Sequence, residues 1–223
     1  MGPFSIAIDG PAGAGKSSVA KLVAIRTGAV YLDTGAMYRA VGLYMRQREI
    51  DLKDAARVAE ASSGAVVDIQ YVDGAQRVFL CGEDVTDRIR RPEISAAASL
   101  VAAVPEVRKR MVAAQREIAR TTSVIMDGRD IGTKVLPSAT LKIYLTADVR
   151  ERARRRYDEL RAMSVCFNQV LRELMDRDNA DRTREESPLR KAEDAIELDT
   201  TDMSQEQAAS RIIELLGERL GEN

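Results

Sequence analysis

The chain has 223 residues, of which 45% are hydrophobic and 31% are charged, and its formal net charge is −1. This length allows one sizeable core with small insertions, and the near-neutral charge gives no reason to expect nucleic acid or a membrane as a partner. The chain has no histidine, which excludes histidine triads, histidine general bases and histidine metal ligands. Cys81 and Cys166 form no metal pattern, and the N-terminus reads straight into a strand without the basic and apolar parts of a signal peptide. We therefore expect reduced thiols and a cytoplasmic location, and a disulfide between the two cysteines is the alternative.

The first predicted strand, Phe4–Ile8, leads into the most informative motif of the chain. Residues 10–17 match G-x-x-x-x-G-K-[ST], and a helix is predicted from Ser17 to about Thr27. In this strand–loop–helix setting the motif predicts a phosphate loop, whose backbone N–H groups and helix N-terminus surround a phosphate. Lys16 is expected to meet the β- and γ-phosphates, and Ser17 is expected to offer a hydroxyl to Mg²⁺. The residues expected to surround the phosphates of the nucleotide are Gly10, Pro11, Ala12, Gly13, Ala14, Gly15, Lys16, Ser17 and Ser18.

Short apolar runs separated mostly by helical segments recur along the chain. They are Phe4–Ile8, Ala29–Leu32, Val124–Met126, Leu141–Leu145 and Ile196–Leu198. The alternation predicts an α/β fold, a three-layer sandwich with a five-stranded parallel sheet covered on both faces.

Two helix starts can be located from local chemistry. Pro105 suits the first position of a helix that runs to about Arg120. Ser204 and Gln207 form a capping-box pattern ahead of the last helix.

Two regions depart from this alternation. Within residues 64–91, Val66–Val72 and Gln76–Cys81 flank Asp73-Gly74, which predicts a hairpin inserted on the substrate side. Residues 149–190 hold two helical stretches dense in arginine. They are interpreted either as an ordinary solvated surface or as a mobile flap that delivers arginines to a transferring phosphate.

Three further motifs follow predicted elements. Asp33–Arg39 begins after the second strand, with Thr34 expected to cap the next helix, and Arg39 serves either as a phosphate clamp or as a surface arginine. Asp127-Gly128-Arg129-Asp130 follows another strand, where carboxyl ends of parallel strands face a ligand. Asp127 is therefore a candidate for the outer shell of Mg²⁺, and a turn with a local ion pair is the alternative. Arg177, Asp181 and Arg184 are spaced so that one helix face carries all three, as an ion-pair face or a phosphate-binding face.

Taken together, these motifs resemble those of the bacterial-type cytidylate kinases over essentially the whole chain. The motifs that carry the resemblance lie at residues 8–17, 33–39, 82–86, 98–108, 127–132 and 177–184. The resemblance implies an Mg²⁺-dependent P-loop enzyme that transfers the γ-phosphate of ATP to CMP or dCMP, and it favours a monomer. It also implies core segments at 1–34, 105–148 and 191–223, a region that binds the nucleoside monophosphate at 35–104, and a helical lid at 149–190.

The resemblance also assigns roles to individual residues. Thr34, Ser99, Arg108 and Asp130 would contact the cytosine, and Asp181 would contact the sugar hydroxyls. Arg39, Arg129, Arg177 and Arg184 would contact phosphates. The catalytic set would comprise Lys16, Arg129, Arg177 and Arg184, with Ser17 and Asp127 at the metal.

Other functions compatible with a phosphate loop are less well supported. A kinase of another small acceptor would not need the base-contact set that includes Ser99, Arg108 and Asp130. A GTP-binding switch protein would need D-x-x-G and N-K-x-D motifs, and the chain has neither. A non-catalytic nucleotide-binding module would not need Lys16, Arg39 and the arginines of the predicted lid.

Overall fold

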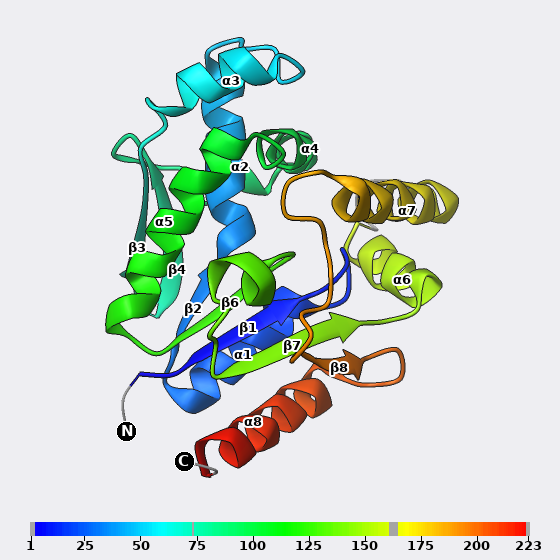
Figure 1. Ribbon diagram of the computed structural model, residues 1–223. Helices are drawn as coiled ribbons and strands as arrows, with labels where there is room; N and C mark the ends of the chain where they lie inside the picture. Colours follow the sequence, from blue (N-terminus) through cyan, green and yellow to red (C-terminus); the bar gives the residue numbers. More distant parts are fainter. Residues whose placement is uncertain (1–2, 73, 161–164, 222–223) are drawn as a thin grey trace. The chain divides into compact units, whose positions relative to one another are not determined.

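The computed structural model describes residues 3–72, 74–160 and 165–221 (Figure 1). It divides into two compact units, one made of Met1–Tyr31 with Ala119–Asn223 and the other of Leu32–Ile118. Asp73 of the predicted hairpin turn and residues 161–164 of the predicted lid lie outside the described residues.

A five-stranded parallel sheet is the framework of the first unit, and only the last two residues of its strand β2 are assigned to the second unit. Its strands are β1 (Ser5–Asp9), β2 (Val30–Asp33), β6 (Val124–Gly128), β7 (Leu141–Thr146) and β8 (Ile196–Asp199). Their order across the sheet is β2-β6-β1-β7-β8, so all five predicted strands are confirmed. Strand β1 is central and pairs in parallel with β6 and β7, with Asp9 opposite Gly128. The segments that follow β1 and β6 therefore start side by side at the carboxyl edge of the sheet.

Helices α1 (Lys16–Thr27) and α8 (Gln205–Gly221) pack against each other and against this sheet. Their apolar residues join those of the strands in one buried cluster that includes Ile8, Val23 and Ile212. The predicted capping box of α8 is confirmed: the Ser204 N–H donates to Oε1 of Gln207 (2.8 Å), and the Gln207 N–H donates to Oγ of Ser204 (3.2 Å). No helix among the described residues is long and apolar enough to cross a membrane.

Helices α6 (Val149–Glu159) and α7 (Phe167–Thr183) pack against each other in the first unit, in the arginine-rich region. The prediction that a helix face carries Arg177, Asp181 and Arg184 is wrong for the last of them. Helix α7 ends at Thr183, and Arg184 has extended backbone angles (φ −61°, ψ 141°). The physical reason is that the chain turns back after α7. The Leu189 N–H donates to the Asp181 carbonyl (2.7 Å). In a longer helix that carbonyl would accept from the next helical residue instead.

The second unit combines helices with a small sheet. Its helices are α2 (Thr34–Gln47), α3 (Ala55–Ser62), the 3₁₀ turn η1 (Arg88–Arg90), α4 (Pro92–Val101) and most of α5 (Pro105–Thr121). The predicted hairpin is confirmed as antiparallel strands β3 (Val67–Val72) and β4 (Ala75–Leu80), and a short strand β5 (Glu83–Asp84) extends it. The start of α5 at Pro105 is also confirmed.

Helix α2 packs closely against α4. The glycine at position 42 permits this approach, since a Cβ there would lie only 3.0 Å from the Cβ of Ala97. The prediction that Thr34 caps α2 is wrong. Asp33 is the capping residue, and its Oδ1 accepts the Ala36 N–H at 2.9 Å. Thr34 is instead the first helical residue and is buried.

Candidate functional site

The phosphate loop connects β1 to α1 at the carboxyl edge of the sheet. Gly10 has φ +149°, and a Cβ there would overlap the carbonyl oxygen of Leu145, so no other residue fits. Gly13 and Gly15 also have positive φ angles, of +73° and +86°. The loop curls back on itself, because Nζ of Lys16 donates to the carbonyl oxygen of Pro11 at 2.6 Å.

Lys16 is a buried cation among other charges. Only 6% of the residue is exposed. Burial lowers its pKa well below the usual 10.5, and the positive charges of Arg129 and Arg177 lower it further, against the opposite effect of Asp127 and Asp181. The sequence analysis assigns Lys16, Arg129 and Arg177 each to phosphate contacts, and these assignments stay predictions.

The end of β6 meets the start of α1 through a carboxylate. Oγ of Ser17 donates to Oδ2 of Asp127 (2.7 Å), and the Tyr31 hydroxyl donates to Oδ1 of the same carboxylate (2.9 Å). A hydroxyl and a carboxylate oxygen are the hard donors that Mg²⁺ prefers, and magnesium sites complete their shell with phosphates and water. The two residues predicted at the metal, Ser17 and Asp127, are thus in contact and suit that ion.

Four of the predicted substrate residues form an ion-pair cluster in the first unit. Nε of Arg129 donates to Oδ2 of Asp181 at 2.6 Å. Arg184 lies 3.7 Å from Oδ1 of Asp181 and 3.9 Å from Oδ1 of Asp130. Arg184 therefore joins the cluster although it lies beyond the end of α7.

The charges in this cluster stabilise one another. Burial alone would raise the pKa of Asp181, but Arg129, Arg177 and Arg184 outweigh it and hold that pKa below the usual 3.8. Burial alone would lower the pKa of Arg129, and Asp181 more than reverses this. Both groups are therefore ionised near neutral pH.

Asp9 is a residue that sequence reasoning missed. It is the last residue of β1, and both its carboxylate oxygens accept backbone N–H groups, from Ile131 (2.8 Å) and Gly132 (2.7 Å). Burial raises its pKa to about 6, although the two hydrogen bonds oppose the shift. Asp9 thus fixes the segment directly after Asp130. Its position before the phosphate loop was the available signal, but its partners lie more than a hundred residues away.

Arg177, on α7, is a further predicted substrate residue of the first unit, and the other four belong to the second unit. Thr34 is the first residue of α2, Ser99 lies in the last turn of α4, and Arg39 pairs with Asp33 at 2.7 Å. Arg108 on α5 is 5% exposed, donates to the Ala102 carbonyl (3.2 Å) and lies 5.5 Å from the ring centre of Tyr38. Among the described residues the buried Nε of Arg39 has no hydrogen-bond partner, which leaves one N–H available to an anion.

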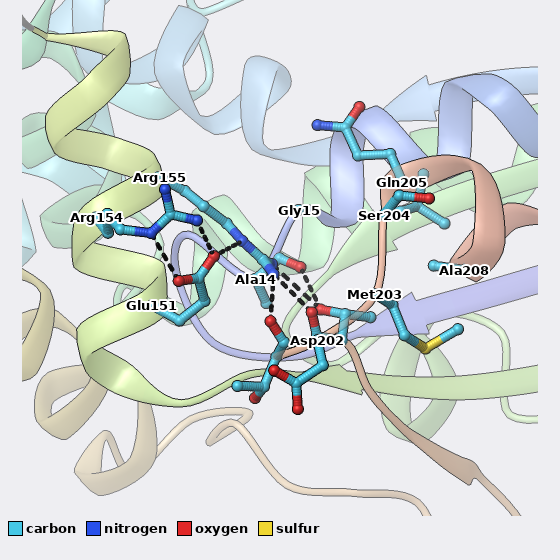
Figure 2. Close-up of a pocket in the computed structure, with 13 residues that line it drawn as sticks. Ala14, Gly15, Glu151, Arg154, Arg155, Asp202, Met203, Ser204, Gln205 and Ala208 are labelled. Carbon is cyan, nitrogen blue, oxygen red and sulfur yellow. Dashed lines mark hydrogen bonds and ion pairs between the residues drawn. The ribbon is translucent and has the colours of Figure 1, made fainter.

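A cavity of about 420 Å³ lies beside the phosphate loop, and sequence reasoning did not predict it (Figure 2). Glu151 accepts from Arg154 and Arg155, and Arg155 also donates to the Thr200 carbonyl at 2.6 Å. The segment after β8 was the available signal for this cavity. Such segments begin at the carboxyl ends of parallel strands, and ligands bind at that edge of the sheet. The lining residues are Ala14, Gly15, Val19, Glu151, Arg154, Arg155, Thr200, Thr201, Asp202, Met203, Ser204, Gln205 and Ala208.

The parallel sheet, the phosphate loop after its central strand and the adjoining arginine–aspartate cluster define a P-loop nucleotide-binding protein. The sequence profile of the family described as cytidylate kinase matches residues 6–218. A cytidylate kinase of Caldicellulosiruptor bescii is 51% identical over 217 residues, which are 96% of each chain. A cytidylate kinase of Bacillus subtilis is 46% identical over 218 residues, 97% of each chain.

The chain therefore belongs to the cytidylate kinase family, and the resemblance seen in its motifs is confirmed. The fold also occurs in the crystal structure of an uncharacterized protein from Eubacterium ventriosum. That structure has a TM-score of 0.55 and 12% identity, and the match covers 96% of this chain and 98% of that one. At this identity the likeness shows the fold alone.

Proposed function

We propose that the protein transfers the γ-phosphate of ATP, in the presence of Mg²⁺, to CMP or dCMP, which gives ADP and CDP or dCDP. The observation that carries this proposal is the phosphate loop with its buried Lys16, together with the ion-pair cluster that contains Arg129, Asp181 and Arg184. Such a group of buried cations favours a polyanion, and phosphoryl transfer depends mainly on positioning and charge stabilisation.

The donor nucleotide would bind along the phosphate loop. Its phosphates would lie against the loop backbone and Lys16, whose ammonium charge an anion would favour. Ala14 and Gly15 contribute both to this loop and to the cavity of about 420 Å³, so the cavity is placed to hold the nucleoside part of ATP. Ser17 and Asp127 would hold Mg²⁺, which would shield the charge of the phosphates when bound.

Different residues would bind the phosphates, the sugar and the base of the acceptor nucleotide. Arg39 with its free Nε, together with Arg129, Arg177 and Arg184, would contact phosphates. Asp181 would accept hydrogen bonds from sugar hydroxyls. Thr34, Ser99, Arg108 and Asp130 would contact cytosine, because its exocyclic amine suits hydroxyl and carboxylate acceptors and its O2 and N3 accept from arginine.

The conformational part of the proposal concerns residues 149–190. We assign α6, α7 and the segment after them to a lid that excludes water and neutralises developing charge once both nucleotides are bound. The remaining parts, 1–34, 105–148 and 191–223, would form the core, and 35–104 would form the acceptor region. A monomer in the cytoplasm is the simplest assembly and location for such an enzyme.

The direct test is ADP release from Mg²⁺-ATP, measured with purified protein against all eight ribo- and deoxyribonucleoside monophosphates. CMP and dCMP should give the highest kcat/KM. Turnover of a purine nucleotide in preference to both would overturn the acceptor assignment.

A substitution at Lys16 tests the site itself. Lys16→Met should lower kcat more than tenfold, a loss of over ~1.4 kcal/mol of transition-state stabilisation, because the lysine follows phosphate charge into the transition state. Lys53→Met changes an exposed lysine on a loop and should leave kcat unchanged. A Lys16→Met protein that keeps more than a tenth of the normal rate would contradict the assignment.

A further inference from the structure

A buried ion pair joins the two helices α6 and α7 to the middle of the phosphate loop. Oδ2 of Asp178, on α7, lies 2.6 Å from a guanidinium nitrogen of Arg152, on α6. Oδ1 of Asp178 accepts the Ala12 N–H (3.1 Å), and the same nitrogen of Arg152 donates to the Ala12 carbonyl (2.9 Å). We call these three residues the loop clasp. Both backbone hydrogen-bonding groups of one loop residue are thus held by side chains of the two helices.

Packing reinforces this connection. Ala12 belongs to the buried cluster formed by Ala153 of α6 with Val170 and Leu174 of α7. Arg152 and Asp178 are each only 5% exposed. The loop residue is therefore part of the small apolar core of the two helices.

A buried ion pair is weak evidence for stability, because the desolvation of two charges offsets most of their attraction, and an apolar pair of similar volume is often as stable. The position of this pair suggests a different purpose. Asp178 directly follows Arg177 and lies three residues before Asp181, so it belongs to the helical turn that carries both. At its other end the clasp holds the loop four residues before Lys16.

We propose that Arg152 and Asp178 are positioning residues for phosphoryl transfer. They hold the phosphate loop, and with it the donor phosphates, in register with the turn of α7 that presents Arg177 and Asp181 to the acceptor. Neither side chain needs to touch a nucleotide. This inference rests on the proposed function, in which Arg177 and Asp181 meet the acceptor nucleotide.

The decisive variant replaces the ion pair by an apolar pair, Arg152→Met with Asp178→Leu. It removes the hydrogen bonds to the Ala12 backbone, and also the one from Nε of Arg152 to the Ala147 carbonyl (2.9 Å), while the apolar side chains fill similar space. Because buried backbone groups lose their partners, the melting temperature should fall by several degrees, and kcat is measured well below it. Because reacting groups must be aligned to fractions of an ångström, kcat should fall at least tenfold. KM for CMP and for ATP should change less than threefold, since the groups that bind them remain.

The matched control is Arg156→Met with Asp176→Leu. These residues lie on the same two helices, the Arg156 side chain is 42% exposed, and Asp176 is exposed. The control should keep normal kcat. A folded Arg152→Met/Asp178→Leu protein with normal kcat would overturn the proposal, and so would a fall in kcat that only follows a fall in melting temperature.

Two further measurements decide the matter if that variant does not fold. Asp178→Asn keeps an acceptor for the Ala12 N–H but leaves the buried Arg152 charge uncompensated, so it should be less stable than the unaltered protein. Assayed below its melting temperature, it should lose kcat with little change in KM. In the unaltered protein without nucleotide, hydrogen exchange should show the Ala12 amide protected, and free exchange there would refute the clasp. If the unaltered protein failed to phosphorylate CMP, the proposed function would fail, while the exchange result would still test the clasp.

Discussion

Ser17 and Asp127 share a hydrogen bond of 2.7 Å although 110 residues separate them in the chain. The contact follows from the sheet, because β1 and β6 are parallel neighbours and Asp9 lies opposite Gly128. The first turn of α1 and the end of β6 are therefore brought to the same edge. This places a hydroxyl and a carboxylate beside Lys16, where a nucleotide-bound Mg²⁺ would lie.

Asp127→Asn should raise the Mg²⁺ concentration needed for half-maximal activity at fixed ATP about tenfold or more, since residues that support a metal shell contribute that much to affinity. The amide keeps an acceptor for Ser17 or Tyr31 but loses the charge that attracts the cation. The measurement is a Mg²⁺ titration of initial rates. Asp87→Asn, at an exposed position, is the control. An unchanged titration midpoint for Asp127→Asn would remove this residue from the metal site.

Asp9 should make the folded protein less stable as pH rises. Its folded pKa is about 6, against 3.8 as the ordinary value, so between these pH values the folded state binds more protons than the unfolded state. The stability associated with protonated Asp9 is fully present below pH 3.8 and is lost as pH rises through 6. A shift of this size corresponds to about 2–3 kcal/mol between pH 4 and pH 7.

Urea unfolding from pH 4 to pH 8 tests this, with Asp9→Asn as the reference protein. The free energy of unfolding of the unaltered protein should fall relative to that of Asp9→Asn over this range, because other carboxylates contribute equally to both. Parallel pH curves for the two proteins would show that the Asp9 pKa is normal in the folded state.

Arg108 should determine the choice of base. UMP presents a carbonyl where CMP has an amine and a protonated N3 where CMP has an acceptor, and a site built for one pattern leaves polar groups unpaired with the other. Arg108→Met should therefore lower kcat/KM for CMP at least tenfold more than for UMP. Lys109→Met, at the adjacent exposed position, should change neither value. Equal losses for CMP and UMP would mean that Arg108, with its contacts to Ala102 and Tyr38, is purely structural.

The sequence predicts those parts of the fold and site that local patterns encode. The apolar runs locate the five strands, and the phosphate-loop motif places Lys16 and Ser17 because its glycines are needed at positive φ. Strand β5 has two residues, too few for any alternation to appear. At the start of α2, Asp33 and Thr34 are both suitable caps, and only the backbone decides between them.

The sequence did not predict several contacts between distant segments. Helical spacing placed Arg184 on α7, but the bond from Leu189 to the Asp181 carbonyl ends the helix first. Asp9 with Ile131, and Asp178 with Ala12, depend on which strands and helices become neighbours. No local pattern in a single sequence identifies such long-range pairs.

We expect Asp181 to bind the sugar hydroxyls of the acceptor nucleotide. It pairs with Arg129 at 2.6 Å and is close to Arg184, so a simple ion-pair role is the competing explanation. If it binds sugar hydroxyls, Asp181→Ala should raise KM for CMP about tenfold or more, because a charge-assisted hydrogen bond contributes roughly 1.5–3 kcal/mol. The increase should be smaller for dCMP, which offers one hydroxyl fewer on the ring.

Asp176→Ala, on the exposed face of the same helix, controls for general effects on α7 and should leave both KM values unchanged.

Limited proteolysis provides an independent measurement of the predicted lid. Cleavage within residues 165–190 should slow when ATP and CMP analogues are bound together, and much less with either alone, because closure needs both nucleotides. Unchanged KM values for Asp181→Ala, together with a cleavage rate that does not depend on the ligands, would mean that α7 only presents an ordinary charged surface. An ion-pair role alone would instead lower the free energy of unfolding of Asp181→Ala and leave the ratio of the CMP and dCMP KM values as it was.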